Sequence, residues 1–120
     1  MIDHYRHGRT VLVRDDDGAL LGTGTLLPRD EDTAEILRMS VARSRRRSGI
    51  GRQILDELLA TAASWGSSVV VLETSSSWDG VVSFYLRAGF IITDVEEGDF
   101  GSDTWFERRI GPADQNAHSA

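Results

Sequence analysis

The stretch Arg46-Arg47-Ser48-Gly49-Ile50-Gly51 decides the fold of this chain. Two basic residues precede two glycines, and an apolar run with helical spacing begins at Ile50. Glycines let an anion approach the main chain closely, and the unpaired N–H groups and dipole of a helix N-terminus attract negative charge. A strand-like segment at 35–41 leads into the loop. The order strand, glycine-rich turn, helix therefore predicts a binding site for a pyrophosphate.

Two better-known phosphate motifs do not fit this stretch. The pattern GxxxxGK followed by serine or threonine needs a lysine, and the region has none. The pattern GxGxxG needs a third glycine where Ile54 stands. A third pattern does fit: glutamine or arginine, then glycine three residues on, then glycine or alanine two further, met here by Arg46, Gly49 and Gly51. Taken alone, the stretch is equally compatible with a solvated, arginine-rich surface loop.

A second motif lies farther along the chain. After a buried-strand pattern at 69–74 comes the segment Asp79-Gly80-Val81-Val82-Ser83-Phe84-Tyr85-Leu86-Arg87-Ala88-Gly89-Phe90. Together, and in this order, the two motifs resemble the signature segments of the GNAT superfamily of N-acetyltransferases. The first resembles its acyl-CoA pyrophosphate loop, and the second has Asp79 near the superfamily's asparagine and Val82 near its alanine. The resemblance covers residues 10 to 110.

Hydrophobic periodicity predicts the helices and strands of an α/β (α+β) protein. The resemblance implies that they form one GNAT-like domain over residues 1–110 with a mixed central sheet of about six strands. The expected order is strand-strand-strand-helix-strand-helix-strand-strand. Strands are expected at 10–14, 19–27, 33–41, 69–74, 90–95 and 104–110, with a loop at 96–103, and helices at 49–65 and 79–88. Asp79 is expected to cap the second helix, and Gly66 and Gly89 to end the two helices. Residues 111–120 are polar and small, which predicts a disordered tail.

Composition excludes several classes of function. The net charge of −6 argues against nucleic-acid binding and is compatible with a cationic substrate. With zero cysteines there is no disulfide, no thiolate metal site and no acyl-cysteine intermediate. The histidines lack metal-ligand spacing, so no metal is assigned. No apolar run approaches membrane-spanning length and the N-terminus has no signal-peptide pattern, which predicts a cytoplasmic protein without a membrane partner.

The sheet is expected to be covered on one face only. Superfamily members usually begin with a strand and two helices, whereas fewer than ten residues precede the first expected strand here. Right-handed crossovers would place both remaining helices on the same face. Strand alternation puts Leu37, Met39 and Val41 on one side of their strand. Arg38 and Ser40 fall on the other side, which is either solvated or covered by a second subunit, and the prediction is a homodimer through this face.

The resemblance implies that acetyl-CoA is the cosubstrate. Its pantetheine arm would lie along Met39, Ser40 and Val41, pairing with the backbone of the first and third, where two parallel strands splay apart. Its pyrophosphate would lie against the loop and the first helical turn, at Arg46, Arg47, Ser48, Gly49, Ile50, Gly51 and Arg52. Asp79 would also touch the coenzyme, although its negative charge disfavours direct contact with a phosphate.

Two side chains are candidates for the chemistry. The resemblance makes Tyr85 the general acid that protonates or hydrogen-bonds the leaving sulfur; otherwise it is a core tyrosine of an amphipathic helix. Glu73, at the end of the central strand, is the candidate base or amine ligand, and is as readily an ordinary strand-end carboxylate. Glu35 is the other carboxylate considered, and a water chain could also carry the proton.

The leading hypothesis is an N-acetyltransferase that moves an acetyl group from acetyl-CoA directly to a primary amine of a small molecule or amino-acid-like substrate. A non-catalytic acyl-CoA-binding sensor or subunit is the alternative from a different class. Protein-lysine acetylation is a third reading, favoured by an open acceptor side. The sequence does not select the amine.

Overall fold

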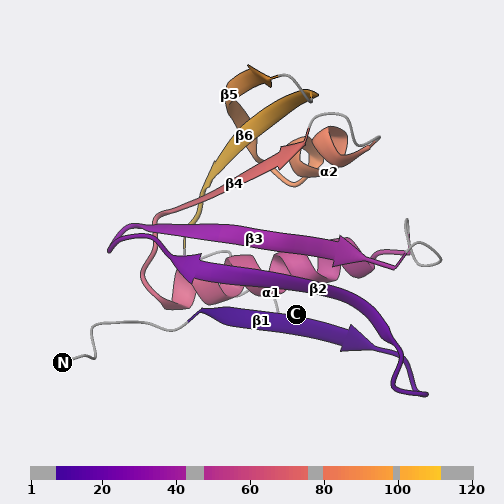
Figure 1. Ribbon diagram of the computed structural model, residues 1–120. Helices are drawn as coiled ribbons and strands as arrows, with labels where there is room; N and C mark the ends of the chain where they lie inside the picture. Colours follow the sequence, from indigo (N-terminus) through magenta and orange to yellow (C-terminus); the bar gives the residue numbers. More distant parts are fainter. Residues whose placement is uncertain (1–7, 43–47, 76–79, 99–100, 112–120) are drawn as a thin grey trace.

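The computed structural model describes residues 8–42, 48–75, 80–98 and 101–111 (Figure 1). One six-stranded sheet has the strand order β1-β2-β3-β4-β6-β5. The strands are β1 Arg9–Arg14, β2 Leu20–Pro28, β3 Thr33–Val41, β4 Val69–Ser75, β5 Ile91–Gly98 and β6 Gly101–Arg109, and the helices are α1 Ile50–Ser64 and α2 Val81–Arg87. Neighbours are antiparallel except for β3 and β4, which are parallel. The predicted class and element order are confirmed.

One face of the sheet carries the core. Residues paired across a sheet share a face, and Leu26, Ile36, Leu72 and Phe106 pair in succession across β2, β3, β4 and β6. All four are buried. We call this side the helix face and the other side the open face. A continuous apolar row of this kind fixes the register, because a slip of one residue would turn it toward solvent.

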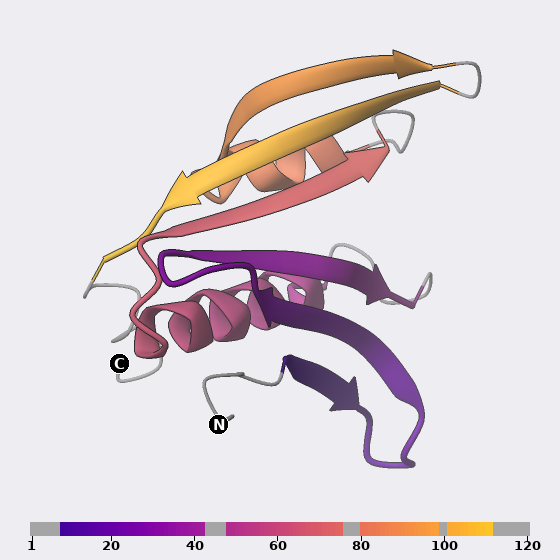
Figure 2. The same cartoon turned by 60° about the vertical axis from the view of Figure 1, so that its left-hand side comes forward.

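Both helices pack on the helix face, as predicted. A Cβ added to Gly24 of β2 would lie 2.7 Å from Ile54 of α1, so this glycine admits the helix closely. The ring of Tyr85 on α2 lies 5.4 Å from that of Phe106 on β6. Figure 1 shows α1 behind β2 and β3, and Figure 2 shows α2 behind β6. In the described part of the chain, no helix covers the open face.

The strand β3 contains a bulge that corrects the predicted alternation. Thr25 of β2 pairs with Leu37, but Thr23 pairs with Ser40, so β3 has one residue more than β2 between these pairs. Leu37 therefore shares the open face with Thr25 and Ser40. It does not share a face with Met39 and Val41, which lie on the helix face. The prediction failed because strict alternation assumes an unbroken ladder.

The helix ends are set by glycines with positive φ. Gly49 precedes α1 with φ 89°, and Gly66 and Gly89 follow the two helices with φ 84° and 92°. The predicted stops at Gly66 and Gly89 are confirmed. The N-cap of α2 is Gly80, with φ 79° and no side-chain hydrogen bond, and not Asp79. The side chain of Asp79 lies outside the described residues.

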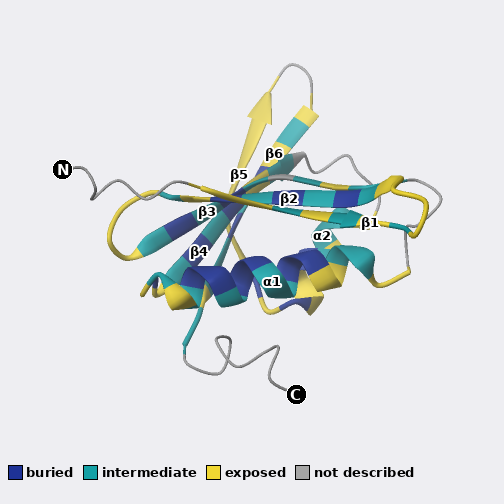
Figure 3. Cartoon of the chain, turned by 90° about the horizontal axis from the view of Figure 1, so that it is seen from below, coloured by how far each residue is buried: buried dark blue, intermediate teal, exposed yellow. Residues whose placement is uncertain are grey.

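The hairpin of β5 and β6 is longer than predicted. The loop expected at 96–103 is largely strand, because β5 continues to Gly98 and β6 begins at Gly101. Acidic residues such as Glu96 and Asp103 disfavour strands by propensity, yet these two pair across the hairpin. Every residue of β5 is exposed, yellow in Figure 3, so ladder hydrogen bonds rather than burial hold this strand. The expected tail at 112–120 lies outside the described residues.

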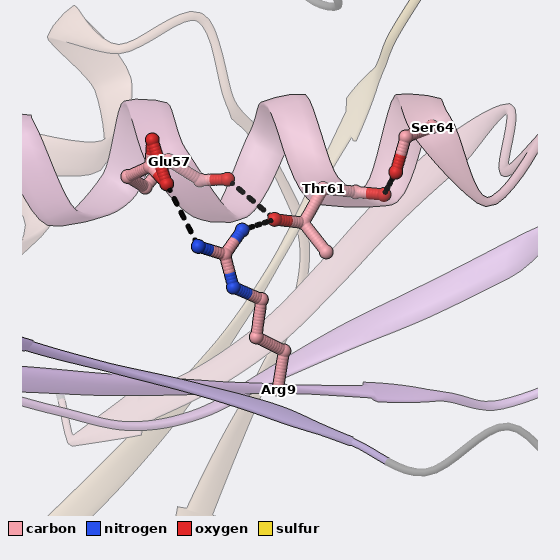
Figure 4. A network of polar contacts seen from close by, with 4 residues as sticks. All are labelled: Arg9, Glu57, Thr61 and Ser64. Carbon is pink, nitrogen blue, oxygen red and sulfur yellow. Dashed lines mark hydrogen bonds and ion pairs between the residues drawn. The ribbon is translucent and has the colours of Figure 1, made fainter.

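A polar contact fastens β1 to α1 (Figure 4). Arg9 donates to Thr61 Oγ1 and, at 3.1 Å, to Glu57 Oε2. Thr61 is buried, and its hydroxyl donates in turn to the carbonyl oxygen of Glu57 at 2.9 Å. The contact adds to the packing of Val11 and Val13, which join the outermost strand to the core. Within the described ranges, neither helix has the length and apolar character needed to span a bilayer.

Candidate active site

The sheet opens between its two parallel strands. β3 and β4 pair from Thr33 and Val69 up to Ile36 and Leu72, and no farther. Beyond these pairs β3 continues to Val41 while β4 continues away from it (Figure 1). We call this unpaired region the split. A strand edge without a partner exposes backbone donors and acceptors that an extended ligand can use.

The backbone of β3 faces the split at alternate residues. The N–H of Ala42 donates to the carbonyl oxygen of Leu21 at 2.7 Å, toward β2. Successive strand residues direct their backbone groups to opposite edges. Val41, and Met39 two residues before it, therefore direct theirs toward the split, and Ser40 toward β2. Met39 and Val41 are the two residues whose backbone was expected to pair with a pantetheine arm.

The N-terminus of α1 has unpaired backbone N–H groups where the sequence predicted an anion site. The first backbone bond of the helix runs from the N–H of Gln53 to the carbonyl oxygen of Gly49, at 3.0 Å. The N–H groups of Ile50, Gly51 and Arg52 precede it and have no acceptor within the helix. No side chain caps this end and the first turn contains no acidic residue. Three donors and the helix dipole thus favour an anion here.

Gly51 joins this helix end to the split. A Cβ added there would lie 3.5 Å from Phe84 of α2 and 3.5 Å from the Val41 side chain. The start of α1, the end of β3 and the middle of α2 therefore meet at one point. The structure brings the predicted phosphate site and the predicted pantetheine strand side by side, although they come from different elements.

The charged members of the predicted phosphate site are only partly described. Arg46, Arg47 and Asp79 lie outside the described residues. Arg52 is half-exposed, and its Nε donates to Asp56 Oδ1 at 2.9 Å, one turn along the helix surface. Ser48 is exposed at the start of the turn. In this structure the anion site of the described residues is made of backbone N–H groups rather than of free cations.

Tyr85 lies on the helix face with its ring enclosed by aromatic neighbours. It contacts Phe84, Phe90 and Phe106 at centroid distances of 5.0, 5.6 and 5.4 Å. The residue is 4% exposed, and burial raises the pKa of the Tyr85 phenol to about 12. A phenol with this pKa stays protonated at neutral pH and can act as a hydrogen-bond donor.

Glu73 lies on the opposite side of the sheet from Tyr85. It is the first residue of β4 beyond the last pair with β3, and it pairs with Trp105 on the open face. The pKa of the exposed Glu73 carboxyl is raised, first by partial desolvation and then by the nearby carboxylates of Asp103, Glu96 and Glu35. The Glu73 carboxylate thus borders the split on the open face, whereas Tyr85 packs against Phe106 of β6 on the helix face.

Sequence reasoning missed three features of this site. Phe84 packs against Gly51 but was read only as a motif residue. Trp105, whose Nε1 donates to Glu96 Oε1 at 3.1 Å, lies beside Glu73, and nothing local in the sequence indicated this pairing. The bulge after Leu37 has no sequence signal such as glycine. Among the described residues, no group of three or more side chains has a metal-binding arrangement.

The fold and this site together define a class: an α+β chain with a sheet parted beside the free N-terminus of a helix, as in acyltransferases that bind a coenzyme. The family model described as the acetyltransferase (GNAT) family matches residues 2–90. The chain belongs to this family. A comparison with curated protein sequences finds no match.

Solved structures agree on the fold. A GNAT family acetyltransferase from Elizabethkingia anophelis, with acetyl-CoA bound, superposes with a TM-score of 0.77 at 24% identity over 86% of this chain and 76% of that one. Ard1 from Thermoplasma volcanium superposes with a TM-score of 0.73 at 25% identity, over 78% of this chain and 65% of Ard1. An acetyltransferase from Bacillus cereus superposes with a TM-score of 0.78 at 23% identity, over 92% of this chain and 80% of that protein. The chain thus spans about two thirds to four fifths of these proteins.

Proposed function

We propose that the protein is an acetyl-CoA-dependent N-acetyltransferase that moves the acetyl group directly to a primary amine of a small molecule. One observation carries the proposal: the uncapped N-terminus of α1 meets the unpaired edge of β3 at Gly51. This arrangement offers donors for a pyrophosphate and, next to them, a strand edge for an amide-containing arm. The family match and the acetyl-CoA held by the Elizabethkingia protein support the same coenzyme.

In the proposed reaction, the amine reaches the thioester from the open face. The helices cover the other face, so the amine nitrogen attacks the thioester carbon through the split. The C–N bond forms, the C–S bond breaks, and the coenzyme leaves as a thiolate while the amine loses one proton. Holding the two reactants in line supplies much of the barrier reduction, up to about 7–11 kcal/mol.

Tyr85 stabilises the leaving thiolate in this proposal. A thiol has a pKa of about 8.5, well below the value of about 12 for Tyr85. Complete proton transfer from the phenol to the thiolate is therefore uphill, and the phenol acts mainly by donating a hydrogen bond. The proton that ends on sulfur comes from the amine or from water.

Glu73 accepts the proton of the amine in this proposal, directly or through water. Its position past the last β3–β4 pair places it at the mouth of the split on the open face. Its raised pKa makes it a stronger base than an ordinary glutamate. Such a base also attracts the protonated form of the amine before reaction.

The test is release of coenzyme A from acetyl-CoA across a panel of amines, with Tyr85→Phe alongside. We expect amine-dependent release and a fall in kcat of about 10- to 100-fold in the variant, because one transition-state hydrogen bond is lost. The KM for acetyl-CoA should change little. Turnover equal to that of the wild type would remove Tyr85 from the mechanism. Coenzyme binding without release by any amine would favour the non-catalytic binding module.

A homodimer stays a prediction. The half of the open face formed by β1, β2 and the adjoining side of β3 carries half-exposed Leu12, with Thr23, Thr25 and Leu37 beside it. This half, rather than the charged half over β4, β6 and β5, suits a second subunit. A monomeric mass at micromolar concentration, measured by sedimentation or light scattering, would count against it.

A further inference from the structure

The open face changes character at the split. Its β4–β6–β5 half and the adjoining edge of β3 form what we call the acidic half. Its carboxylates come from four different strands and include Glu35 on β3, Glu73 on β4, Asp103 and Glu107 on β6, and Asp94 and Glu96 on β5. Strand pairing, and not sequence proximity, gathers them. The helix face has no comparable set, because its strand residues are apolar and packed against α1 and α2.

These carboxylates are close enough to affect one another. The charges of Asp103, Glu96 and Glu35 all raise the pKa of Glu73. Arg29 pairs with Glu35 at 2.9 Å. Within the described ranges, no arginine forms an ion pair with Glu73, Glu96 or Asp103. Several like charges on one uncovered sheet face, of which Glu35 has an arginine partner and Glu73, Glu96 and Asp103 have none within the described ranges, favour a ligand of positive charge.

An aromatic side chain lies in the middle of this surface. Trp105 of β6 pairs with Glu73 of the neighbouring strand β4. It lies two residues from Asp103, on the same face of β6. Its indole N–H donates to Glu96 at 3.1 Å, which orients the ring. An ammonium beside an indole and carboxylates gains cation–π attraction as well as charge attraction. Trp105 has no other assigned role, because it lies on the face away from the core.

The surface is continuous with the proposed reaction site. Glu73 stands where β4 leaves β3, and Trp105, Asp103 and Glu96 lie on the next strands outward. Neighbouring strands are about 5 Å apart. An amine held at the split therefore has negative charge and an indole one to two strand spacings away, in the direction leading from the split to β5. A second ammonium at that distance would lie over β6.

We propose that the acceptor is a small di- or polyamine, whose reacting nitrogen enters the split at Glu73 while a second ammonium is held over β6 by Trp105, Glu96 and Asp103. This inference rests on the proposed function, since it assigns the acceptor of that reaction. The coenzyme site on the helix face has no part in it.

The test compares two acceptors that differ by one charge, 1,4-diaminobutane and 1-aminobutane, in coenzyme A release. We expect kcat/KM to be at least about tenfold higher for the diamine, mainly through a lower KM, because several exposed charges each contribute modestly. The preference should shrink as salt is raised from 0.01 to 0.5 M, since ions screen exposed charges. Equal kcat/KM for the two amines would overturn the proposal.

The variant Glu96→Gln/Asp103→Asn removes two charges and keeps the side chains of Tyr85 and Glu73, although it lowers the pKa of Glu73. Glutamine at 96 keeps an oxygen that accepts the Trp105 N–H, so the ring should stay in place. We expect the diamine preference to fall to about twofold or less, because this ratio of the two kcat/KM values cancels any change in the basicity of Glu73 that affects both amines alike. Asp16→Asn/Asp17→Asn, in the exposed turn before β2, makes the same change in net charge and should keep the full preference. A preference retained in the first variant, or lost in the control, would contradict the assignment.

A binding measurement separates this inference from the proposed function. The indole N–H signal of Trp105, assigned with Trp105→Phe, is followed by NMR while each amine is added. A saturable shift with the diamine, absent with 1-aminobutane, supports a cation site whatever the turnover. If that shift occurs without coenzyme A release, acetyl transfer fails and the cation site stands. If release occurs without the shift or the preference, acetyl transfer stands and the acceptor assignment fails.

Discussion

The two faces of the sheet are built by different forces. On the helix face, apolar side chains such as Leu72 and Phe106 are buried under α1 and α2. On the open face, their immediate neighbours Glu73 and Trp105 meet solvent, charge and one another. The coenzyme side of the proposed site is thus held by packing, whereas the acceptor side is a charged surface laid over a rigid sheet. Substitutions on the first face should change stability, and those on the second should change selectivity.

The largest expected effect tests this contrast in one strand. Phe106→Ala removes a fully buried ring that Tyr85 contacts, and should lower the free energy of unfolding by about 3–5 kcal/mol. Trp105→Ala, one residue away on the open face, should cost no more than about 1 kcal/mol. Urea unfolding followed by circular dichroism measures both. Equal losses in the two variants would break the distinction between the faces.

Alkaline titration sharpens the same contrast through Tyr85. Its folded pKa of about 12 exceeds the ordinary value of 10.0, so the folded state keeps a proton that the unfolded state loses. The stabilising contribution is complete below pH 10 and disappears as pH rises from 10 to 12, at most about 2–3 kcal/mol. Unfolding free energies of the wild type and Tyr85→Phe should therefore converge or cross over this window. Parallel curves in the two proteins would mean that the phenol is not buried.

Two glycines on the helix side of the molecule, Gly24 of β2 and Gly51 of α1, should change the stability in opposite directions when replaced by alanine. Gly24→Ala places a methyl 2.7 Å from Ile54 and 2.9 Å from Met39, and should destabilise by about 1–3 kcal/mol. Gly51→Ala meets only ordinary contacts of 3.5 Å within a helix, and should stabilise by about 0.5–1 kcal/mol. If the first turn of α1 binds the pyrophosphate, Gly51→Ala should nevertheless weaken acetyl-CoA binding in calorimetry. Unchanged affinity would indicate that the phosphates do not approach this residue.

Most of the helix face could be predicted because its signals are local. The spacing of Ile54, Leu55 and Leu58 marks α1, and Gly49 and Gly66 mark its ends, because few other residues adopt positive φ without strain. The open face was harder to predict. Exposed side chains leave no periodic signal, and acidic residues in β5 and β6 disguise strands as a loop. The bulge in β3 follows from its register with β2, which no short segment reveals.

The sequence by itself determined the family, the order of the elements and the glycine that precedes α1, because each depends on residues within one short stretch. Only the tertiary structure decided where β3 and β4 part, that Leu37 turns to the open face, and that Glu73 and Tyr85 lie on opposite faces of the sheet. It also brought together Glu35, Glu73, Glu96 and Asp103 from four strands. These features arise from strand pairing between distant segments, whose register is fixed by the buried apolar row that they share.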